Sequence, residues 1–115
     1  MEDGLLAEVE TEVLGWPDTT CEPGRFDSLA FRYGRREIGH VHRDRIADLP
    51  VTPEMRVELL AGGRARPHRA GSRGYISYPI EGQEDVTTVL EILGRNYERA
   101  KAAADKRAAS QKDEA

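Results

Sequence analysis

The chain has 115 residues, of which 38% are hydrophobic and 33% are charged, and its formal net charge is −4. That length fits a single domain with a modest core. No apolar run approaches the roughly 18 residues of a membrane-spanning helix, and the acidic start lacks the apolar stretch of a signal peptide. We therefore expect a cytoplasmic protein without a membrane partner, and the lone Cys21 excludes a disulfide within the chain.

Charge is distributed unevenly along the chain. Residues 1–24 contain seven acidic and no basic side chains, whereas residues 25–73 contain eleven arginines and six acidic side chains. Clustered arginines bind carboxylates, phosphates and nucleic acids. The middle segment therefore indicates an anionic partner, unless its arginines serve only as a solvated surface.

The first half of the chain predicts a helix followed by strands. Apolar residues at helical spacing indicate an amphipathic helix over 2–14, and residues 18–23 predict a short edge strand. Residues 28–33 alternate between apolar and polar side chains, which is typical of a half-buried strand. The pair Gly34-Arg35 suits a two-residue turn into a second strand over 36–44.

The register of this hairpin determines where two histidines lie. A regular register places Phe31 opposite Ile38 and Leu29 opposite His40. His42 then lies on the same face as His40, because side chains two positions apart in a strand share a face. We therefore predict that both imidazoles project from the face of the sheet that carries the core.

The segment that follows predicts a strand, a helix, a loop and another strand. Residues 45–51 indicate a short strand, and Thr52 is a suitable N-cap for a helix that ends at Gly62-Gly63. An arginine-rich polar loop over 64–74 then leads into a strand over 75–80.

A continuous apolar stripe from Val86 to Ala100 indicates a last helix that begins near Gln83 and packs on the sheet. From residue 102 the sequence is rich in alanine and charge, so we expect a domain over 1–101 and a frayed or disordered tail over 102–115. The order α-β-β-β-(β)-α-β-α predicts a single α+β domain with a mostly antiparallel sheet and helices on one face.

Four runs resemble the small luciferase-family domain, which is found largely as short bacterial proteins without an assigned activity. These runs are 34–42, 63–68, 74–77 and 84–97, and the resemblance covers roughly residues 25–100. This resemblance does not carry over a light-emitting reaction. The end of the chain is also similar, more distantly, to the double-wing fold of YjbR/MmcQ-type proteins, and that likeness implies an α+β domain of a kind sometimes proposed to contact DNA.

The three histidines form the principal candidate site. His40 and His42 leave one strand face about 7 Å apart, and His68 joins them if the Pro67 turn folds over the sheet. Three imidazoles suit a divalent metal that polarises a carbonyl or activates water. Asp44 would be a fourth ligand or would orient one of the rings.

A pocket without metal is the leading reading of the same residues. In it, a small anionic or carbonyl-bearing ligand binds histidine, arginine and tyrosine side chains. The candidates for ligand binding are His40, His42, His68, Arg43, Arg66, Arg69, Tyr75 and Tyr78, and those for metal binding are His40, His42 and His68. A nucleic-acid or protein adaptor that uses the arginines of 25–73 is a further alternative.

A purely structural role for the histidines also fits the sequence. His40 would bond to the backbone, His42 would pair with Asp44 or Asp48, and His68 would cap its turn. The sequence contains no nucleophile motif, P-loop or dinucleotide-binding glycine pattern. It therefore identifies no reaction and no cofactor beyond a candidate divalent metal.

Overall fold

The structure, a computed structural model, describes residues 3–114. Its elements are α1 (Gly4–Leu14), β1 (Thr19–Pro23), β2 (Ser28–Tyr33), β3 (Arg36–His42), β4 (Ile46–Pro50), α2 (Pro53–Ala61), β5 (Arg66–Pro67), β6 (Tyr75–Pro79) and α3 (Gln83–Glu114). The strands form one antiparallel sheet in the order β1-β2-β3-β4-β6-β5. The predicted α+β class is confirmed, and the two-residue β5 lies inside the predicted loop.

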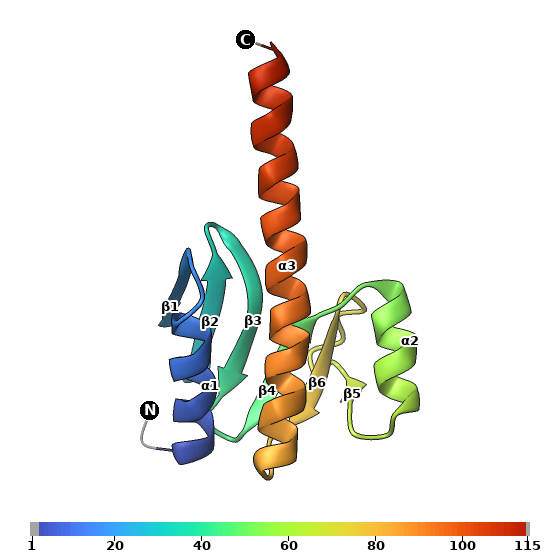
Figure 1. The fold of residues 1–115 in the computed structure, drawn as a ribbon. Helices are drawn as coiled ribbons and strands as arrows, with labels where there is room; N and C mark the ends of the chain where they lie inside the picture. Colours follow the sequence, from blue (N-terminus) through green and yellow to red (C-terminus); the bar gives the residue numbers. More distant parts are fainter. Residues whose placement is uncertain (1–2, 115) are drawn as a thin grey trace.

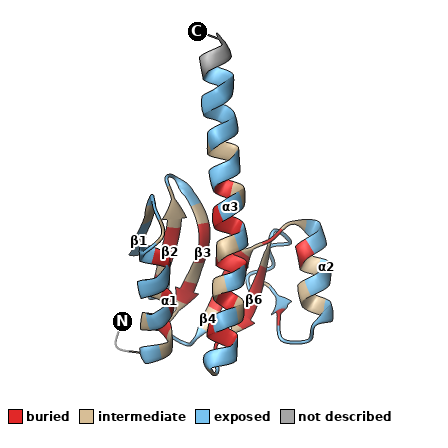
Figure 2. Ribbon diagram, viewed as in Figure 1, coloured by how far each residue is buried: buried red, intermediate tan, exposed pale blue. Residues whose placement is uncertain are grey.

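The helices lie on one side of the sheet (Figure 1). α1 packs against α3, and α3 crosses β2, β3, β4 and β6, while α2 lies toward the β6 end. The buried stripe of α3 faces the buried centres of the strands (Figure 2). The core between them includes Val9, Phe31, Ile38, Val41, Leu49, Ile76, Val89 and Leu93.

Side-chain caps begin the first two helices. The Asp3 carboxylate accepts a hydrogen bond from the N–H of Leu5 at 3.0 Å, and the Thr52 hydroxyl accepts one from the N–H of Met55 at 3.1 Å. The predicted Thr52 cap is therefore confirmed. On α2 only Met55 is buried, while Leu59 and Leu60 are partly buried, because this helix lies at the margin of the sheet.

α3 continues as a helix to Glu114, where we expected fraying from residue 102. Its last core residue is Ala100, and residues 105–111 are exposed. Alanine and lysine are strong helix formers, so the backbone can continue the helix without packing. The division into a domain and a separate tail stays a prediction. None of the helices in the described part of the chain is long and apolar enough to cross a membrane.

A β-bulge in the β2–β3 hairpin changes the predicted register. Next to the turn, Arg32 pairs with Glu37 as expected. The following pair joins Phe31 to Gly39, so Ile38 is the extra residue and the predicted pairing of Phe31 with Ile38 is wrong.

The bulge determines which face the histidines occupy. His40 pairs with Ala30 rather than with Leu29, and both histidines project away from the helices. The prediction that they share the core face is therefore wrong, because one inserted residue moves the following side chains to the other face. Because of the same insertion, Glu37 lies on the same face as His40, although the two residues are three positions apart.

Two residues adapt the core to this bulge. A Cβ at Gly39 would lie 2.6 Å from Cδ2 of Leu93, so only glycine lets the bulged strand lie directly beneath α3. The buried Asn96 amide donates hydrogen bonds of 2.9 Å to the carbonyls of Ile38 and Pro50. It thereby ties α3 to the bulge and to the end of β4.

Candidate functional site

A row of side chains crosses the face of the sheet that the helices leave uncovered. Its members are register partners on four neighbouring strands, namely Ala30 on β2, His40 on β3, Asp48 on β4 and Ser77 on β6. Register partners project to the same side, so these side chains form one line. The small Ala30 leaves room beside the histidine.

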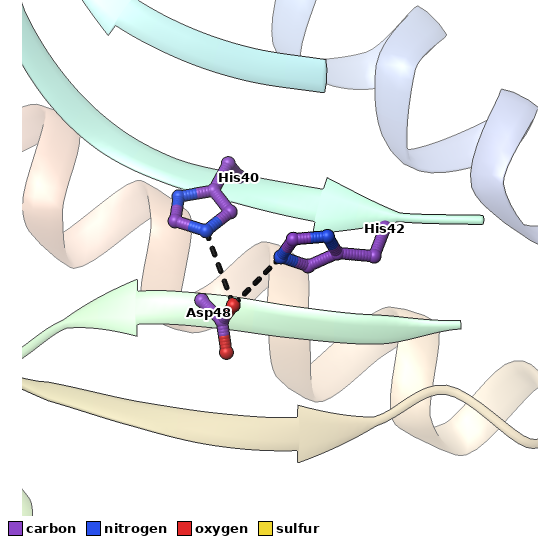
Figure 3. Close-up of side chains that lie close together, drawn as sticks. All are labelled: His40, His42 and Asp48. Atoms are coloured by element: carbon purple, nitrogen blue, oxygen red, sulfur yellow. Dashed lines mark hydrogen bonds and ion pairs between the residues drawn. The ribbon is translucent and has the colours of Figure 1, made fainter. Parts of the chain in front are cut away.

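Asp48 is the centre of this row, and its side chain is only 4% exposed. Its Oδ2 accepts from His40 Nε2 at 3.1 Å and from His42 Nε2 at 2.8 Å (Figure 3), and its Oδ1 accepts from the Ser77 hydroxyl at 2.7 Å. His68 Nε2 lies 3.8 Å from Oδ2. Burial opposes ionisation, but the hydrogen bonds hold the pKa of Asp48 well below its ordinary value.

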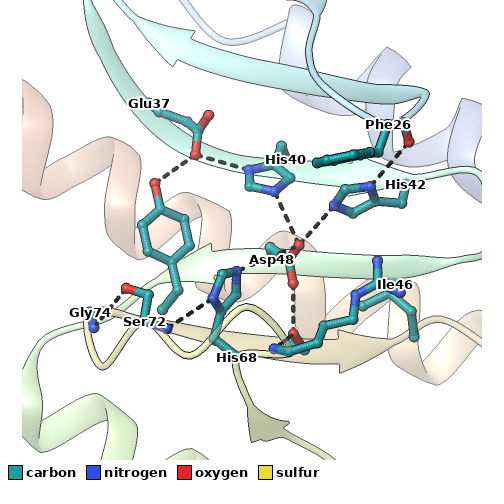
Figure 4. Close-up of polar contacts among 12 residues, drawn as sticks. Phe26, Glu37, His40, His42, Ile46, Asp48, His68, Ser72 and Gly74 are labelled. Carbon is teal, nitrogen blue, oxygen red and sulfur yellow. Dashed lines mark hydrogen bonds and ion pairs between the residues drawn. The ribbon is translucent and has the colours of Figure 1, made fainter.

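His40 lies between two carboxylates. Its Nδ1 is 3.0 Å from Glu37 Oε2, which also accepts from the Tyr75 hydroxyl at 2.6 Å (Figure 4). Hydrogen bonds to Asp48 and then to Glu37 raise the pKa of His40 to about 9, so this ring is an imidazolium at neutral pH. Burial and the bond to Glu37 raise the pKa of Tyr75, which therefore keeps its proton.

The other two histidines are held by backbone groups. His42 Nδ1 lies 3.5 Å from the carbonyl oxygen of Phe26. His68 Nδ1 accepts from the N–H of Ser72 at 3.2 Å, which places the proton of a neutral ring on Nε2. His68 therefore directs an N–H toward Asp48 and the space above it.

A pocket of about 840 Å³ opens over this cluster. The side chains of His40, His42 and Asp48 line it from the sheet. The loop over 24–27 lines one side and the segment over 68–70 lines another. Its volume lies within the range of sites that enclose small organic ligands.

Several of the predicted site residues meet here. The three histidine rings gather around Asp48, and the Tyr75 ring lies 6.0 Å from the ring of His40 and 5.5 Å from that of His68. Arg43 and Arg69 line the pocket.

Other predicted residues lie elsewhere. Tyr78 is buried in the core, because it is an odd number of positions from Tyr75 and so projects to the opposite face. Arg66 lies on the edge strand β5 and is not among the described residues that line the pocket. Asp44 forms an ion pair of 2.6 Å with Arg69 instead of contacting a histidine ring.

Sequence reasoning gave Asp48 only a minor place, as one partner of His42. A signal was available, because Asp48 stands between Ala47 and Leu49 in a short apolar strand, and a buried acid needs partners. Glu37 carried no comparable signal, since only the bulge places it beside His40.

His40, His42 and Asp48 could together hold a metal ion, since their ligand atoms lie within 4.8 Å of one another. Zinc–ligand distances place neighbouring atoms of a tetrahedral site about 3.3 Å apart. The observed separations of 3.1 and 2.8 Å from the carboxylate are close to that value. A small outward movement of the rings, with loss of the shared protons, would admit an ion, whereas His68 Nε2 carries a proton and lies farther away.

The chain was compared with protein families, curated proteins and solved structures. A family model described as a Luciferase domain matches residues 35–96, which include all three histidines and Asp48. No curated protein and no solved structure matches the chain. The more distant likeness to double-wing proteins stays a prediction.

Proposed function

This chain belongs to the Luciferase domain family, and we propose that it binds a small oxygen-bearing ligand at a divalent metal ion held by His40, His42 and Asp48. The observation that carries the proposal is the convergence of two Nε2 atoms and one carboxylate on one point of the pocket wall. Two imidazoles and a carboxylate form a ligand set that suits zinc and non-haem iron.

The outer nitrogens of both rings support this assignment. Histidines that bind a metal usually donate their other N–H to a carboxylate or a backbone carbonyl. His40 Nδ1 faces Glu37, which Tyr75 holds in place, and His42 Nδ1 faces the carbonyl of Phe26. Each ring is therefore oriented with Nε2 directed inward. An ion would displace the protons on these Nε2 atoms, so its affinity should increase with pH.

The cluster is open toward the pocket, so a ligand in the pocket could reach a bound metal ion. His40, His42 and Asp48 would leave a bound divalent ion with open coordination positions, and such an ion would supply a Lewis acid for a carbonyl or a water molecule in the pocket. His68 directs its N–H to the same space and is placed to donate to a ligand oxygen. The proposal thus joins the expected ligand pocket with the expected metal.

The adaptor alternative has weaker support from the structure. Four arginines of the middle segment, Arg32, Arg45, Arg64 and Arg69, form ion pairs with carboxylates of the same chain. Such pairs reduce the positive charge that a nucleic-acid phosphate would meet.

Metal analysis tests the proposal directly. Purified chain is challenged with zinc, nickel and iron, freed of loosely bound ions and assayed for metal content. We expect close to one equivalent of at least one metal in the wild type. His42→Ala and Asp48→Asn should weaken binding at least tenfold, because each removes a ligand.

The matched control is Asp44→Asn, which removes a carboxylate from the pocket rim but no proposed ligand. It should leave metal affinity within a factor of two. A wild type that retains less than about a tenth of an equivalent of every metal would refute the metal part of the proposal.

A further inference from the structure

We propose that the ligand of this pocket is an amphipathic carboxylate, with an anionic head at the metal and two free arginines and a flat apolar body against Phe26. The inference rests on the proposed function and adds the chemical class of the ligand. Three features carry it, namely unpaired arginines, the charge balance of the pocket, and an exposed aromatic ring at its rim.

Two pocket arginines have no carboxylate partner among the described side chains. Arg25 and Arg43 line the pocket, and neither forms an ion pair with a carboxylate of residues 3–111. The other lining arginines, Arg32 and Arg69, each pair with an acidic side chain of the pocket wall. A guanidinium offers a planar fork of donors that matches a carboxylate. Arg25 and Arg43 therefore remain available to an anionic ligand.

The charge balance of the metal-bound pocket also favours an anion. If the histidines are neutral, the two positive charges of a divalent ion would balance the negative charges of Asp48 and Glu37. Of the other acidic side chains that line the pocket, only Asp27 lacks an ion pair among the described residues. The two positive charges of Arg25 and Arg43 therefore exceed the one negative charge of Asp27. The pocket would carry about one excess positive charge. Metal and anion should therefore strengthen each other's binding, and thermodynamic linkage makes the two effects equal.

Phe26 supplies an apolar surface beside these charges. Its side chain is 85% exposed, although it is one of the largest apolar residues of the chain. Its backbone has φ 56°, a left-handed conformation that phenylalanine rarely adopts, and Asp27 has the same value. In that conformation the Phe26 carbonyl faces His42 while the ring lines the pocket (Figure 4).

An exposed aromatic ring above a polar floor suits a ligand with two unlike ends. The ring can stack on a flat apolar body, and such contacts strengthen binding beyond the burial of area alone. A head group without an apolar body would leave Phe26 in water. An apolar body without a charge would leave Arg25 and Arg43 without a partner.

Three probes separate these contributions in the zinc-loaded protein. Naphthoate has both ends, acetate has only the head, and naphthamide has the body without the charge. Titration calorimetry should show that naphthoate binds at least tenfold more tightly than either of the other two. Equal binding of naphthamide and naphthoate would overturn the inference, because the arginines would then contribute nothing.

Substitutions assign the two ends to their residues. The double variant Arg25→Gln and Arg43→Gln should weaken naphthoate binding at least tenfold, while Arg73→Gln, an exposed arginine outside the pocket lining, should not. Phe26→Ala should weaken naphthoate three- to tenfold and leave acetate unchanged. The control Val57→Ala removes an exposed apolar side chain elsewhere and should change neither. If neither pocket variant weakens naphthoate, the inference is wrong.

A parallel zinc titration distinguishes failure of this inference from failure of the proposed function. If zinc binds and naphthoate does not, the ligand class is wrong and the metal site stands. If zinc does not bind, the metal proposal fails, and naphthoate is titrated into the metal-free protein. Binding that depends on Arg25 and Arg43 then supports the ligand class, and its absence overturns the class as well.

Discussion

Replacing Asp48 with asparagine tests the charge network that underlies the site. The substitution keeps the size of the side chain and removes the negative charge that faces His40 and His42. Asparagine can still accept the hydrogen bond from Ser77. The change in stability therefore reports chiefly on the charge.

The size of the expected stability change follows from the raised pKa of His40. Its pKa rises from 6.5 to about 9 in the folded protein, and its side chain is only 21% exposed. That difference corresponds to about 3 kcal/mol of stabilisation. Asp48 is the larger cause and Glu37 the smaller. We therefore expect Asp48→Asn to lower the free energy of unfolding by about 2 kcal/mol near pH 6.

The pH dependence gives the sign of the effect. A folded-state pKa above the unfolded value means that the protonated ring stabilises the fold. This contribution is fully present below pH 6.5 and is lost as the pH rises through about 9. The wild type should lose up to about 3 kcal/mol over that interval, whereas Asp48→Asn should show a much flatter profile. The deficit of the variant should therefore shrink at high pH.

Urea unfolding of both proteins across this interval, with a chelator present, measures the effect. Asp44→Asn is the control, because it breaks an exposed ion pair with Arg69 and should cost less than about 1 kcal/mol with little dependence on pH. If Asp48→Asn keeps the wild-type slope between pH 6.5 and 9, the reasoning is refuted, since His40 would not owe its charge to Asp48.

One further substitution and one truncation test the packing. Gly39→Ala should lower the free energy of unfolding by about 1–3 kcal/mol in urea, because its Cβ would meet Cδ2 of Leu93 at 2.6 Å. Gly4→Ala, in the first turn of α1 and with no atom within 4 Å of the added Cβ, is the control, and equal stability of the two variants would contradict the packing argument. A chain that ends at Ala104 should lose helical circular dichroism but less than about 0.5 kcal/mol of stability, since residues 105–111 are exposed, and a loss above about 1 kcal/mol would show that this segment packs.

The elements with local signals could be predicted from the sequence. Thr52 caps α2 as expected because a hydroxyl before Pro53 needs nothing from the rest of the fold. The order of strands and helices followed from hydrophobic periodicity in the same way. The helical state of residues 102–114 was missed, because we weighted the missing apolar stripe above the helix propensity of alanine and lysine.

The register of β3 could not be obtained by such local reasoning. The bulge fits the close packing of Gly39 against Leu93 of α3 and the hydrogen bond from Asn96 to the Ile38 carbonyl. Both contacts join residues that are far apart in the sequence. The spacing of His40 and His42 was still informative, because two positions apart means the same face in any register. Which face of the sheet His40 and His42 occupy depends on whether a residue is inserted between them and the turn of the β2–β3 hairpin.

The cost of burying charge favours the open face as the place for this cluster. Two of its carboxylates, Asp48 and Glu37, are ionised, and the pKa of His40 keeps its ring charged at neutral pH. Beneath α3 these groups would be removed from water, and each charge would cost several kcal/mol unless it were fully paired. On the uncovered face, His40 and Glu37 remain partly exposed, and Tyr75 and Ser77 donate hydrogen bonds to the two carboxylates. The one-residue bulge therefore does more than shift a strand, because it separates an apolar face that stabilises the domain from a charged face that is available to a ligand.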